Sequence, residues 1–286
     1  MNYSELYHYG EHELGAAGIS EAALDARLLL EFITGHDRTT LLAHPDTAVG
    51  DDDAKRYREL VAKRAEHIPL QHLTGTACFM GIDFVVDMNV LVPRQDSECL
   101  VEEAMRYVED GADILDICTG SGCLLLALMH YKNNCRGVGV DISSAALFVA
   151  RTNCENLTAA GGLNGGTAEF FAGDMYDALA DPNRKFDYII SNPPYIRTAD
   201  IDALMPEVRD HDPRIALDGG DDGLTFYRTI ADGAGAHLAR YGRIFLEIGC
   251  DQAEAVTRIL TAAGFSGIET IKDYAGCDRV ITAVLK

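Results

Sequence analysis

The sequence has no apolar run of the roughly 20 residues that are needed to cross a bilayer. Its first residues, Met1–Glu5, also lack the basic and apolar segments of a secretory signal. Apolar residues nevertheless make up 48% of the 286 residues and charged residues 24%, which is the balance of an ordinary globular protein. We therefore expect a soluble, cytoplasmic protein that is long enough for two domains.

Basic residues are scarce. The chain has 24 Lys and Arg residues against 45 Asp and Glu residues, and its formal net charge is −21. A non-specific DNA-binding protein needs a basic surface that displaces counterions from phosphates. The charge therefore argues against stable nucleic-acid binding, although a local basic patch or a basic protein partner is still compatible with it. A generally acidic proteome would explain the charge equally well.

The sequence also lacks paired cysteines. None of the eight cysteines forms a C-x-x-C pair, and no histidine stands at zinc-finger spacing. We therefore expect no metal site, and we interpret several of the cysteines, which lie in apolar segments, as small buried thiols in a reducing compartment. They occupy positions 78, 99, 118, 123, 135, 154, 250 and 277.

Residues 1–75 are predicted to form a small helical domain. Ser20 can cap a helix in which Leu24, Leu28 and Phe32 recur every four residues. Acidic residues near position 51 are favourable at the start of a further helix, where they interact with the helix dipole.

Residues 76–92 are predicted to form a β-hairpin that links this helical domain to a larger one at residues 93–286. In the larger domain, strands alternate with helices, which indicates a mostly parallel sheet covered on both faces. Only a short loop separates the last two strands, so we expect an antiparallel pair at the sheet edge. The predicted strands are 112–117, 137–141, 168–172, 187–191, 243–248, 266–271 and 279–285, and the predicted helices are 97–109, 122–131, 143–158, 223–240 and 251–263.

Glycines follow the first strand of the predicted sheet, and carboxylates follow the next two. Gly120 and Gly122 would let a ligand approach backbone N–H groups, but the position three residues later is Leu125, which argues against NAD or FAD. Asp141 can accept hydrogen bonds from both ribose hydroxyls, or it can cap the next helix. Asp174 can likewise accept from an adenine amino group or act as a structural cap.

Met175 can pack on the adenine ring beside Asp174. No G-x-x-x-x-G-K-[ST] sequence is present to hold a polyphosphate. The three strand ends together predict a cleft for an adenosine-containing cofactor, and S-adenosylmethionine fits that description.

The fourth strand leads into Ser191-Asn192-Pro193-Pro194-Tyr195. Pro193 favours an extended backbone at Asn192, and neither proline can donate a hydrogen bond. The Asn192 side-chain oxygen and the Pro193 carbonyl are therefore expected to be fixed acceptors, and Tyr195 offers a face for stacking. This arrangement suits a planar group that carries an NH2, such as a carboxamide or an adenine amine.

Several further segments make the pattern specific. They are Ile68–Gly75, Pro93–Glu98, the Gly120 loop, Asn192–Tyr195, Asp212–Gly220 and Asp273–Val280. In this order they resemble the HemK/PrmC family, the peptide chain release factor N5-glutamine methyltransferases. The similarity covers essentially the whole chain, including the helical N-terminal part that other N-P-P-Y methyltransferases lack.

The resemblance implies a class I S-adenosylmethionine-dependent methyltransferase fold, which is Rossmann-like with a seven-stranded, mostly parallel sheet. It implies methylation of the GGQ glutamine of class 1 release factors, S-adenosylhomocysteine as product, and an N-terminal domain that grips the protein substrate. We expect a monomer. The cofactor residues implied are Cys118, Thr119, Gly120, Ser121, Gly122, Asp141, Asp174, Met175 and Asn192, and the substrate and catalytic residues are Asn192, Pro193, Pro194 and Tyr195.

Two residues depart from the family pattern. Cys118 stands where many relatives have glycine, and Met175 occupies a position that is often aromatic. A small thiol and a flexible thioether can fill similar space.

Other candidates are assigned secondary roles. Arg94 is either a solvated loop charge or part of a ligand pocket, and Glu247 is either a structural carboxylate or a cofactor contact. We expect His72 to be structural. His211 and Asp212 are placed in a substrate-facing lid, and Arg279 is expected to anchor the strands at the edge.

Three alternative functions share the predicted cleft. A nucleic-acid amino-methyltransferase would use the same N-P-P-Y element, but the acidic charge argues against it. A methyltransferase could also act on another protein glutamine, such as one in a ribosomal protein. A non-catalytic adenosine-binding protein could have the same fold, because fold alone does not establish chemistry.

Overall fold

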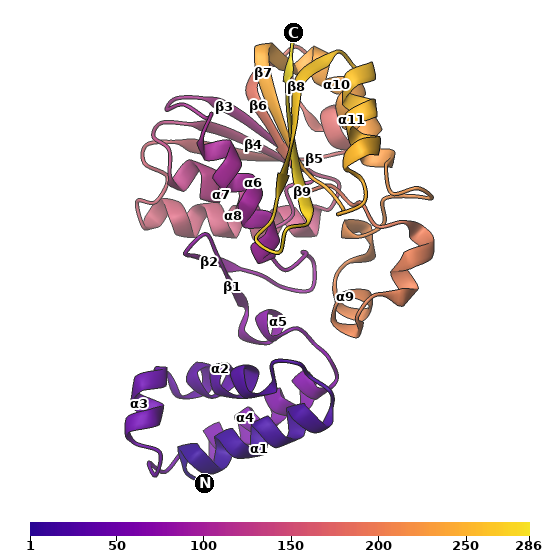
Figure 1. The fold of residues 1–286 in the computed structure, drawn as a ribbon. Coiled ribbons are helices and arrows are strands. Elements are labelled where there is room, and N and C mark those ends of the chain that lie inside the picture. Colours follow the sequence, from indigo (N-terminus) through magenta and orange to yellow (C-terminus); the bar gives the residue numbers. More distant parts are fainter. The chain divides into compact units, whose positions relative to one another are not determined.

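The computed structural model describes residues 1–286, which form two compact units (Figure 1). One unit consists of Met1–Thr76 together with Met205–His211, and the other of Ala77–Leu204 and Asp212–Lys286. The chain therefore leaves the second unit after Leu204, contributes a short helix to the first unit, and returns at Asp212.

The first unit is entirely helical. Its elements are α1 (Tyr3–Ala16), α2 (Ala22–Thr34), α3 (Arg38–Ala43), α4 (Asp51–Ala65), α5 (Leu70–Thr74) and α9 (Pro206–His211). A capping box formed by Asn2 and Glu5 starts α1, and three aspartates occupy the first turn of α4, as predicted.

The predicted start and buried face of α2 are wrong. The N-cap is Glu21, and no side chain caps this helix, so Ser20 does not act as the cap. Leu24 and Phe32 are exposed, whereas the buried stripe includes Leu29 and Leu30. The helix has two overlapping apolar stripes, and the one that contacts α1 and α4 is buried.

A buried ion-pair network ties α9 to the other helices of its unit. The Arg64 guanidinium of α4 contacts Asp25 of α2 at 2.7 Å and Glu207 of α9 at 2.5 Å. Burial raises the pKa of Asp25, and the Arg64 guanidinium opposes that shift. Removing one member would leave an uncompensated buried charge, which is costly.

The second unit is built on a seven-stranded sheet, as predicted. Its order is β5-β4-β3-β6-β7-β9-β8, with β3 to β7 parallel and β9 antiparallel to both β7 and β8. The strands are β3 (Asp113–Ile117), β4 (Arg136–Asp141), β5 (Thr167–Ala172), β6 (Phe186–Ser191), β7 (Leu238–Glu247), β8 (Phe265–Lys272) and β9 (Asp278–Leu285).

Helices cover both faces of this sheet (Figure 1). Successive side chains of a strand point to opposite faces, and accordingly Ile114 of β3 packs in one core cluster and Leu115 in the other. One face carries α6 (Gln95–Met105), α7 (Cys123–His130) and α8 (Ser144–Ala159), and the other carries α10 (Thr225–His237) and α11 (Ala253–Ala262). None of the helices has the length and apolarity that a membrane span requires.

The remaining elements are short. The predicted hairpin is present as β1 (Thr76–Phe79) and β2 (Ile82–Val85), but residues 86–92 form no strand, and their valines pack instead against α8. Three 3-10 turns, η1 (Met175–Ala178), η2 (Thr198–Ala203) and η3 (Arg214–Ala216), complete the unit. The predicted helix over 223–240 ends at His237, because Leu238 already pairs with Phe186 of β6.

Two glycines of α1 provide a test of the packing in the helical unit. A Cβ atom at Gly10 would lie 2.0 Å from the Tyr57 hydroxyl, whereas one at Gly15 would meet nothing within 4 Å. We expect Gly10→Ala to lower the free energy of unfolding by about 1–3 kcal/mol through overpacking. Gly15→Ala should leave it unchanged or raise it by up to about 1 kcal/mol, because alanine favours a helix. Urea unfolding would measure both variants, and equal effects would contradict this account.

Candidate cofactor and substrate site

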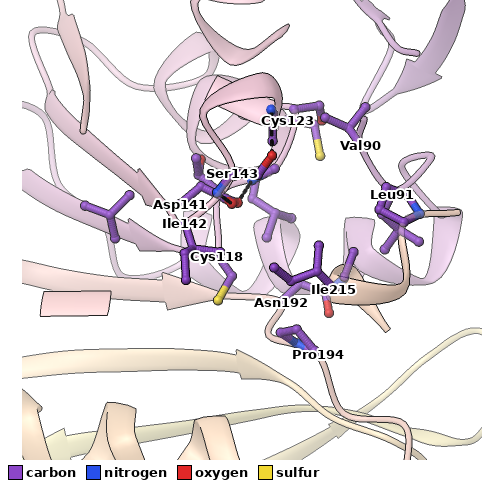
Figure 2. Close-up of a pocket in the computed structure, with 18 of the residues that line it drawn as sticks. Val90, Leu91, Cys118, Cys123, Asp141, Ile142, Ser143, Asn192, Pro194 and Ile215 are labelled. Atoms are coloured by element: carbon purple, nitrogen blue, oxygen red, sulfur yellow. Dashed lines mark hydrogen bonds between the residues drawn. The ribbon is translucent and has the colours of Figure 1, made fainter. Parts of the chain in front are cut away.

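The candidate site lies at the carboxyl ends of β3 and β6. These strands are neighbours in the sheet, and from β3 the chain continues to one side of the sheet and from β6 to the other. Ligands of open α/β sheets bind at such a switch point. A cavity of about 270 Å³ lies there (Figure 2). The predicted residues that line it are Cys118, Thr119, Gly120, Ser121, Asp141, Asp174, Met175, Asn192 and Pro194.

The loop between β3 and α7 makes a tight turn with three residues at positive φ. These are Cys118 (59°), Gly120 (55°) and Gly122 (78°). Gly122 does not line the cavity: it is the N-cap of α7, and a Cβ atom there would contact Leu126 and Ala150 at 3.2 and 3.3 Å. It is therefore a packing glycine, whereas Gly120 lies on the cavity wall.

Asp141 joins this loop to the end of β4. Its Oδ2 accepts from the Gly120 backbone N–H at 2.9 Å, and its Oδ1 accepts from that of Ser143 at 2.8 Å. The N-cap of α8 is Ser143, whose Oγ accepts from the Ala146 N–H, so the helix-cap role for Asp141 is wrong. Burial raises the pKa of Asp141, and the backbone hydrogen bonds oppose that shift. A carboxylate has about four acceptor positions, so Asp141 can still accept from a ligand.

Asp174 and Met175 follow β5 and begin η1. The Asp174 side chain makes no cap hydrogen bond, although it occupies the N-cap position. Met175 is buried at a φ of 50°, and its Sδ lies 4.0 Å from the Cys118 Sγ. The two residues that depart from the family pattern therefore contact each other, so one polarisable pair fills that part of the wall.

Asn192 directly follows the buried end of β6. The Ser191 hydroxyl donates to the Ile117 carbonyl at 2.6 Å, which ties the end of β6 to the end of β3. The Asn192 Nδ2 donates to the Ser97 Oγ of α6 at 3.3 Å. This leaves the Asn192 Oδ1 as an acceptor on the cavity wall (Figure 2).

Pro193 and Tyr195 do not line the cavity. The Tyr195 hydroxyl donates to the Glu247 Oε1 at 3.3 Å, and the Tyr195 carbonyl accepts from the Gln252 Nε2 at 3.0 Å. Tyr195 therefore anchors the Asn192–Tyr195 element through contacts that lie outside the cavity. Its stacking role remains a prediction.

Comparison with known proteins identifies the family. Residues 5–75 match the PrmC N-terminal domain and residues 114–211 match a methyltransferase domain. The chain is 41% identical to a release factor glutamine methyltransferase of Geobacter sulfurreducens, over 94% of this chain and 91% of the relative. It is 39% identical to the enzyme of that name from Agrobacterium fabrum, over 94% of this chain and 92% of the relative. The chain belongs to the release factor glutamine methyltransferase family.

The fold of the second unit is also that of solved methyltransferase structures. A methyltransferase from Pyrococcus furiosus aligns with a TM-score of 0.52 at 21% identity, over 71% of this chain and 89% of the other. The predicted fold class is therefore confirmed.

Sequence reasoning missed part of the cavity wall of this family member. The additional lining residues are Asn89, Val90, Leu91, Pro93, Ser97, Cys123, Leu124, Val140, Ile142, Ser143, Ala146, Pro213, Ile215, Ala216 and Phe226. Val90 and Leu91 had been placed in the hairpin linker. Ile215 could have been recognised, because it is an apolar residue close to Asp212 and Pro213 in the sequence, and in the structure 54% of it is exposed.

Arg94 and Asp212 form an ion pair beside this cavity. The Arg94 Nη2 lies 2.5 Å from the Asp212 Oδ2, the Asp212 side chain is buried, and Arg94 lines the cavity. Of the two predicted roles for Arg94, the structure therefore supports the pocket residue. The Asp212 carboxylate therefore contacts a residue of the cavity wall, and its place in a substrate-facing lid stays a prediction.

The segment that follows Asp212 holds the backbone of the Asn192–Tyr195 element. The Ile196 N–H donates to the Leu217 carbonyl at 3.0 Å, and the Gly219 N–H donates to the Ile196 carbonyl at 2.8 Å. A Cβ atom at Gly219 would lie 2.8 Å from the Pro194 carbonyl oxygen. This close approach explains why glycine is needed in the Asp218-Gly219-Gly220 sequence.

The other candidates lie outside the cavity. His72 belongs to the helical unit, as does His211, whose Nε2 lies 3.3 Å from the Glu66 carbonyl. Arg279 contacts Asp273 at 3.0 Å and Asp96 at 3.2 Å, so it anchors the β8–β9 edge as predicted and also reaches α6.

Asp116, beneath the Gly120 loop, predicts a pH-dependent stability. Its Oδ2 accepts from the Thr119 hydroxyl at 2.6 Å, but its Oδ1 is buried and makes no hydrogen bond. Burial raises the pKa of Asp116 to about 7, and repulsion from Asp141 adds to the shift. The folded state therefore holds a proton that the unfolded chain releases near pH 4. The stability that Asp116 contributes is fully present below pH 4 and is lost as the pH rises through 7.

We expect Asp116→Asn to remove this loss. Between pH 5 and 7, the unfolding free energy of the variant relative to wild type should rise by about 1.4 kcal/mol per pH unit. Urea unfolding at pH 5, 6, 7 and 8 would measure it, with the exposed Asp83→Asn as the matched control. Parallel pH curves for Asp116→Asn and wild type would contradict the assignment.

Proposed function

We propose that this protein transfers a methyl group from S-adenosylmethionine to the N5 nitrogen of the GGQ glutamine in class 1 peptide chain release factors. One observation carries the proposal. In a chain of this family, a cavity with acceptors suited to an adenosine cofactor has the Asn192 side chain in its wall. The substrate named for the relatives supplies the target.

The cavity residues fit the cofactor. The Asp141 carboxylate would accept from the ribose hydroxyls, and Asp174 would accept from the adenine amine beside Met175. The backbone of Thr119 to Ser121 would line the methionine end. When bound, S-adenosylmethionine supplies an electrophilic methyl group on a sulfonium, and a wall with carboxylates and only one basic side chain, Arg94, suits that positive charge.

The Asn192 element would orient the substrate amide. A carboxamide nitrogen is a weak nucleophile because its lone pair is delocalised into the carbonyl. The Asn192 Oδ1 and the Pro193 carbonyl would accept the two N–H groups and hold the nitrogen with its lone pair directed at the methyl group. The substrate nitrogen would take up the methyl group that the cofactor supplies and would release one amide proton to solvent, so that the product amide is neutral. Orientation and charge stabilisation supply the rate, so no dedicated base is required.

We assign residues 1–75 to recognition of the protein substrate, 76–92 to the linker and 93–286 to the methyltransferase domain. The match of residues 5–75 to the PrmC N-terminal domain supports the first assignment. A single glutamine side chain offers few contacts, so a separate binding surface would provide most of the specificity for the release factor.

Asn192→Ala tests the role of the amide acceptor. We expect kcat to fall by about 10²–10³ while the Kd for S-adenosylmethionine changes by less than about threefold, because the lost interaction acts mainly on the substrate amide. Asn183→Ala, in the turn that precedes β6, is the matched control and should retain wild-type kcat. Single-turnover methyl transfer and calorimetry would separate the two quantities. Equal losses of kcat and cofactor affinity would contradict the proposed division of roles.

The substrate is tested with labelled S-adenosylmethionine. The protein is offered a class 1 release factor, the same factor with its GGQ glutamine replaced by alanine, unmethylated DNA and ribosomal proteins. We expect label on the intact factor alone, with one methyl group on that glutamine by mass spectrometry. Label on DNA would support the nucleic-acid alternative, and label on a ribosomal protein would support a different glutamine substrate.

A further inference from the structure

Asn153 of α8 carries a buried amide that the proposed reaction does not use. The residue is 3% exposed, and it does not line the cavity. Its Oδ1 accepts from the Val85 backbone N–H at 2.7 Å. Its Nδ2 donates to the Val85 carbonyl at 3.0 Å and to the Ser121 carbonyl at 2.9 Å. One side chain therefore binds two backbone segments that lie far apart in the sequence.

These three hydrogen bonds require an amide. An asparagine side chain has an acceptor oxygen and a nitrogen with two donor protons, whereas an ionised aspartate only accepts and an aliphatic side chain does neither. The Val85 N–H needs an acceptor and the two carbonyls each need a donor, so only one orientation of the Asn153 amide satisfies all three groups. Because Asn153 is buried, water does not readily replace it, and its loss would leave backbone groups unpaired, which is costly.

Ser121 is the residue of the Gly120 loop that still has a backbone donor without a partner in the protein. The N–H groups of Thr119, Gly120 and Gly122 donate to other protein atoms at 2.8–3.0 Å. The Ser121 N–H makes no hydrogen bond, and Ser121 lines the cavity. Asn153 therefore holds, through the carbonyl, the one residue of this turn whose N–H is left for a ligand.

Val85 ends β2, and the segment that follows it reaches the cavity wall. The valines of this segment pack against Ala146 and Val149 of α8, and residues 89–91 line the cavity. Ala146, Val149 and Asn153 are separated by three or four residues, so they lie on one face of α8. This segment and the loop at Ser121 are therefore held by the same helix, and Asn153 is bonded to both sides.

We propose that Asn153 is a positioning residue for the cofactor, and that it couples the Gly120 loop to Val85 and the segment after it. A loop whose Ser121 peptide is already fixed loses less conformational freedom when a ligand binds. The coupling is reciprocal, so a cofactor that binds the ordered loop also stabilises the hydrogen bonds between Asn153 and Val85. The proposed linker, residues 76–92, thereby takes part in cofactor binding. The inference rests on the cofactor of the proposed function, but not on the release factor as substrate.

Asn153→Ala tests the positioning role. We expect the Kd for S-adenosylhomocysteine, measured by calorimetry, to rise by about tenfold, because the loop loses the bond that fixes Ser121. The kcat for methylation of the release factor at saturating S-adenosylmethionine should fall by less than about threefold, since Asn153 touches no reacting group. This is the reverse of the division expected for Asn192→Ala.

Asn156→Ala is the matched control, because it makes the same change at an exposed position of α8. It should keep the wild-type Kd and kcat. A wild-type Kd in Asn153→Ala would overturn the inference. So would a loss of thermal stability in Asn153→Ala without a change in Kd, because it would show a merely structural role.

Hydrogen exchange of the Val85 amide tests the coupling, and it starts from the wild-type protein. We expect saturating S-adenosylhomocysteine to slow exchange of the Val85 N–H by at least about tenfold, as followed by NMR. The Met80 N–H, which donates to Glu98 from the turn of the same hairpin, should not respond. A Val85 amide that exchanges equally fast with and without the ligand would contradict the coupling, even if neither Asn153 variant folds.

Asn153→Asp separates the two connections. Its carboxylate can still accept from the Val85 N–H, but it cannot donate to the Ser121 carbonyl. We expect the Val85 amide to stay protected and no longer to respond to S-adenosylhomocysteine, whose Kd should rise by about tenfold, as in Asn153→Ala. A response that persists in Asn153→Asp would overturn the coupling, because it would show that the effect runs through the lining residues 89–91 instead.

The two proposals can fail separately. A wild-type protein that binds S-adenosylhomocysteine and shows the Val85 response, but methylates no release factor, would overturn the proposed function and support this inference. A wild-type protein that binds no S-adenosylhomocysteine would overturn both.

Discussion

The pairing of β3 with β6 is the constraint on which the site depends. These parallel strands are consecutive in the sheet but not in the sequence, and the chain leaves their carboxyl ends in opposite directions. The hydrogen bond from the Ser191 hydroxyl to the Ile117 carbonyl closes the junction at its last residues. The Gly120 loop and the Asn192 element therefore start from one rigid edge, so their spacing is set by the sheet rather than by the loops.

Around that edge, each functional loop is braced by another segment of the chain. The Asp141 carboxylate accepts from the Gly120 N–H, the Gly219 N–H donates to the Ile196 carbonyl, and the Gln252 side chain donates to the Tyr195 carbonyl. Preorganisation of this kind has a cost in stability, because carboxyl groups such as those of Asp116 and Glu247 are buried where their charged forms are poorly solvated. Burial raises the pKa of Asp116 and of Glu247 to about 7, so both carboxyl groups change their ionisation state near neutral pH.

Much of this arrangement could be predicted from the sequence. The apolar runs of β4 and β6 are largely buried and are therefore easy to recognise, and Asp141 ends the first while Asn192 directly follows the second. Long-range packing was less accessible. The buried face of α2 was misjudged because its two apolar stripes are similar, and only contacts with other helices decide between them.

The same limit applied to the cavity wall. Ile215 and Leu91 reach it from segments without regular periodicity, so no local pattern marks them. Glu247 was recognised only as a choice between a structural and a cofactor role. Its actual surroundings, Tyr195 and Ser97, come from elements separated from it by more than 50 residues of sequence.

Because α9 packs in the helical unit, the protein cannot be truncated at the domain boundary in the sequence without separating α9 from its neighbours. Residues 205–211 lie within the sequence of the methyltransferase domain, yet they pack in the helical unit, where Arg64 binds Glu207. A cut after residue 76 would therefore separate α9 from the rest of its compact unit. The remaining chain would still contain α9, but it would lack the Arg64 guanidinium and the helices against which α9 packs. The last residue of α9 directly precedes Asp212, which pairs with Arg94 on the cavity wall. Removing the N-terminal module would thus also remove the packing partners of a segment that directly precedes Asp212 in the sequence.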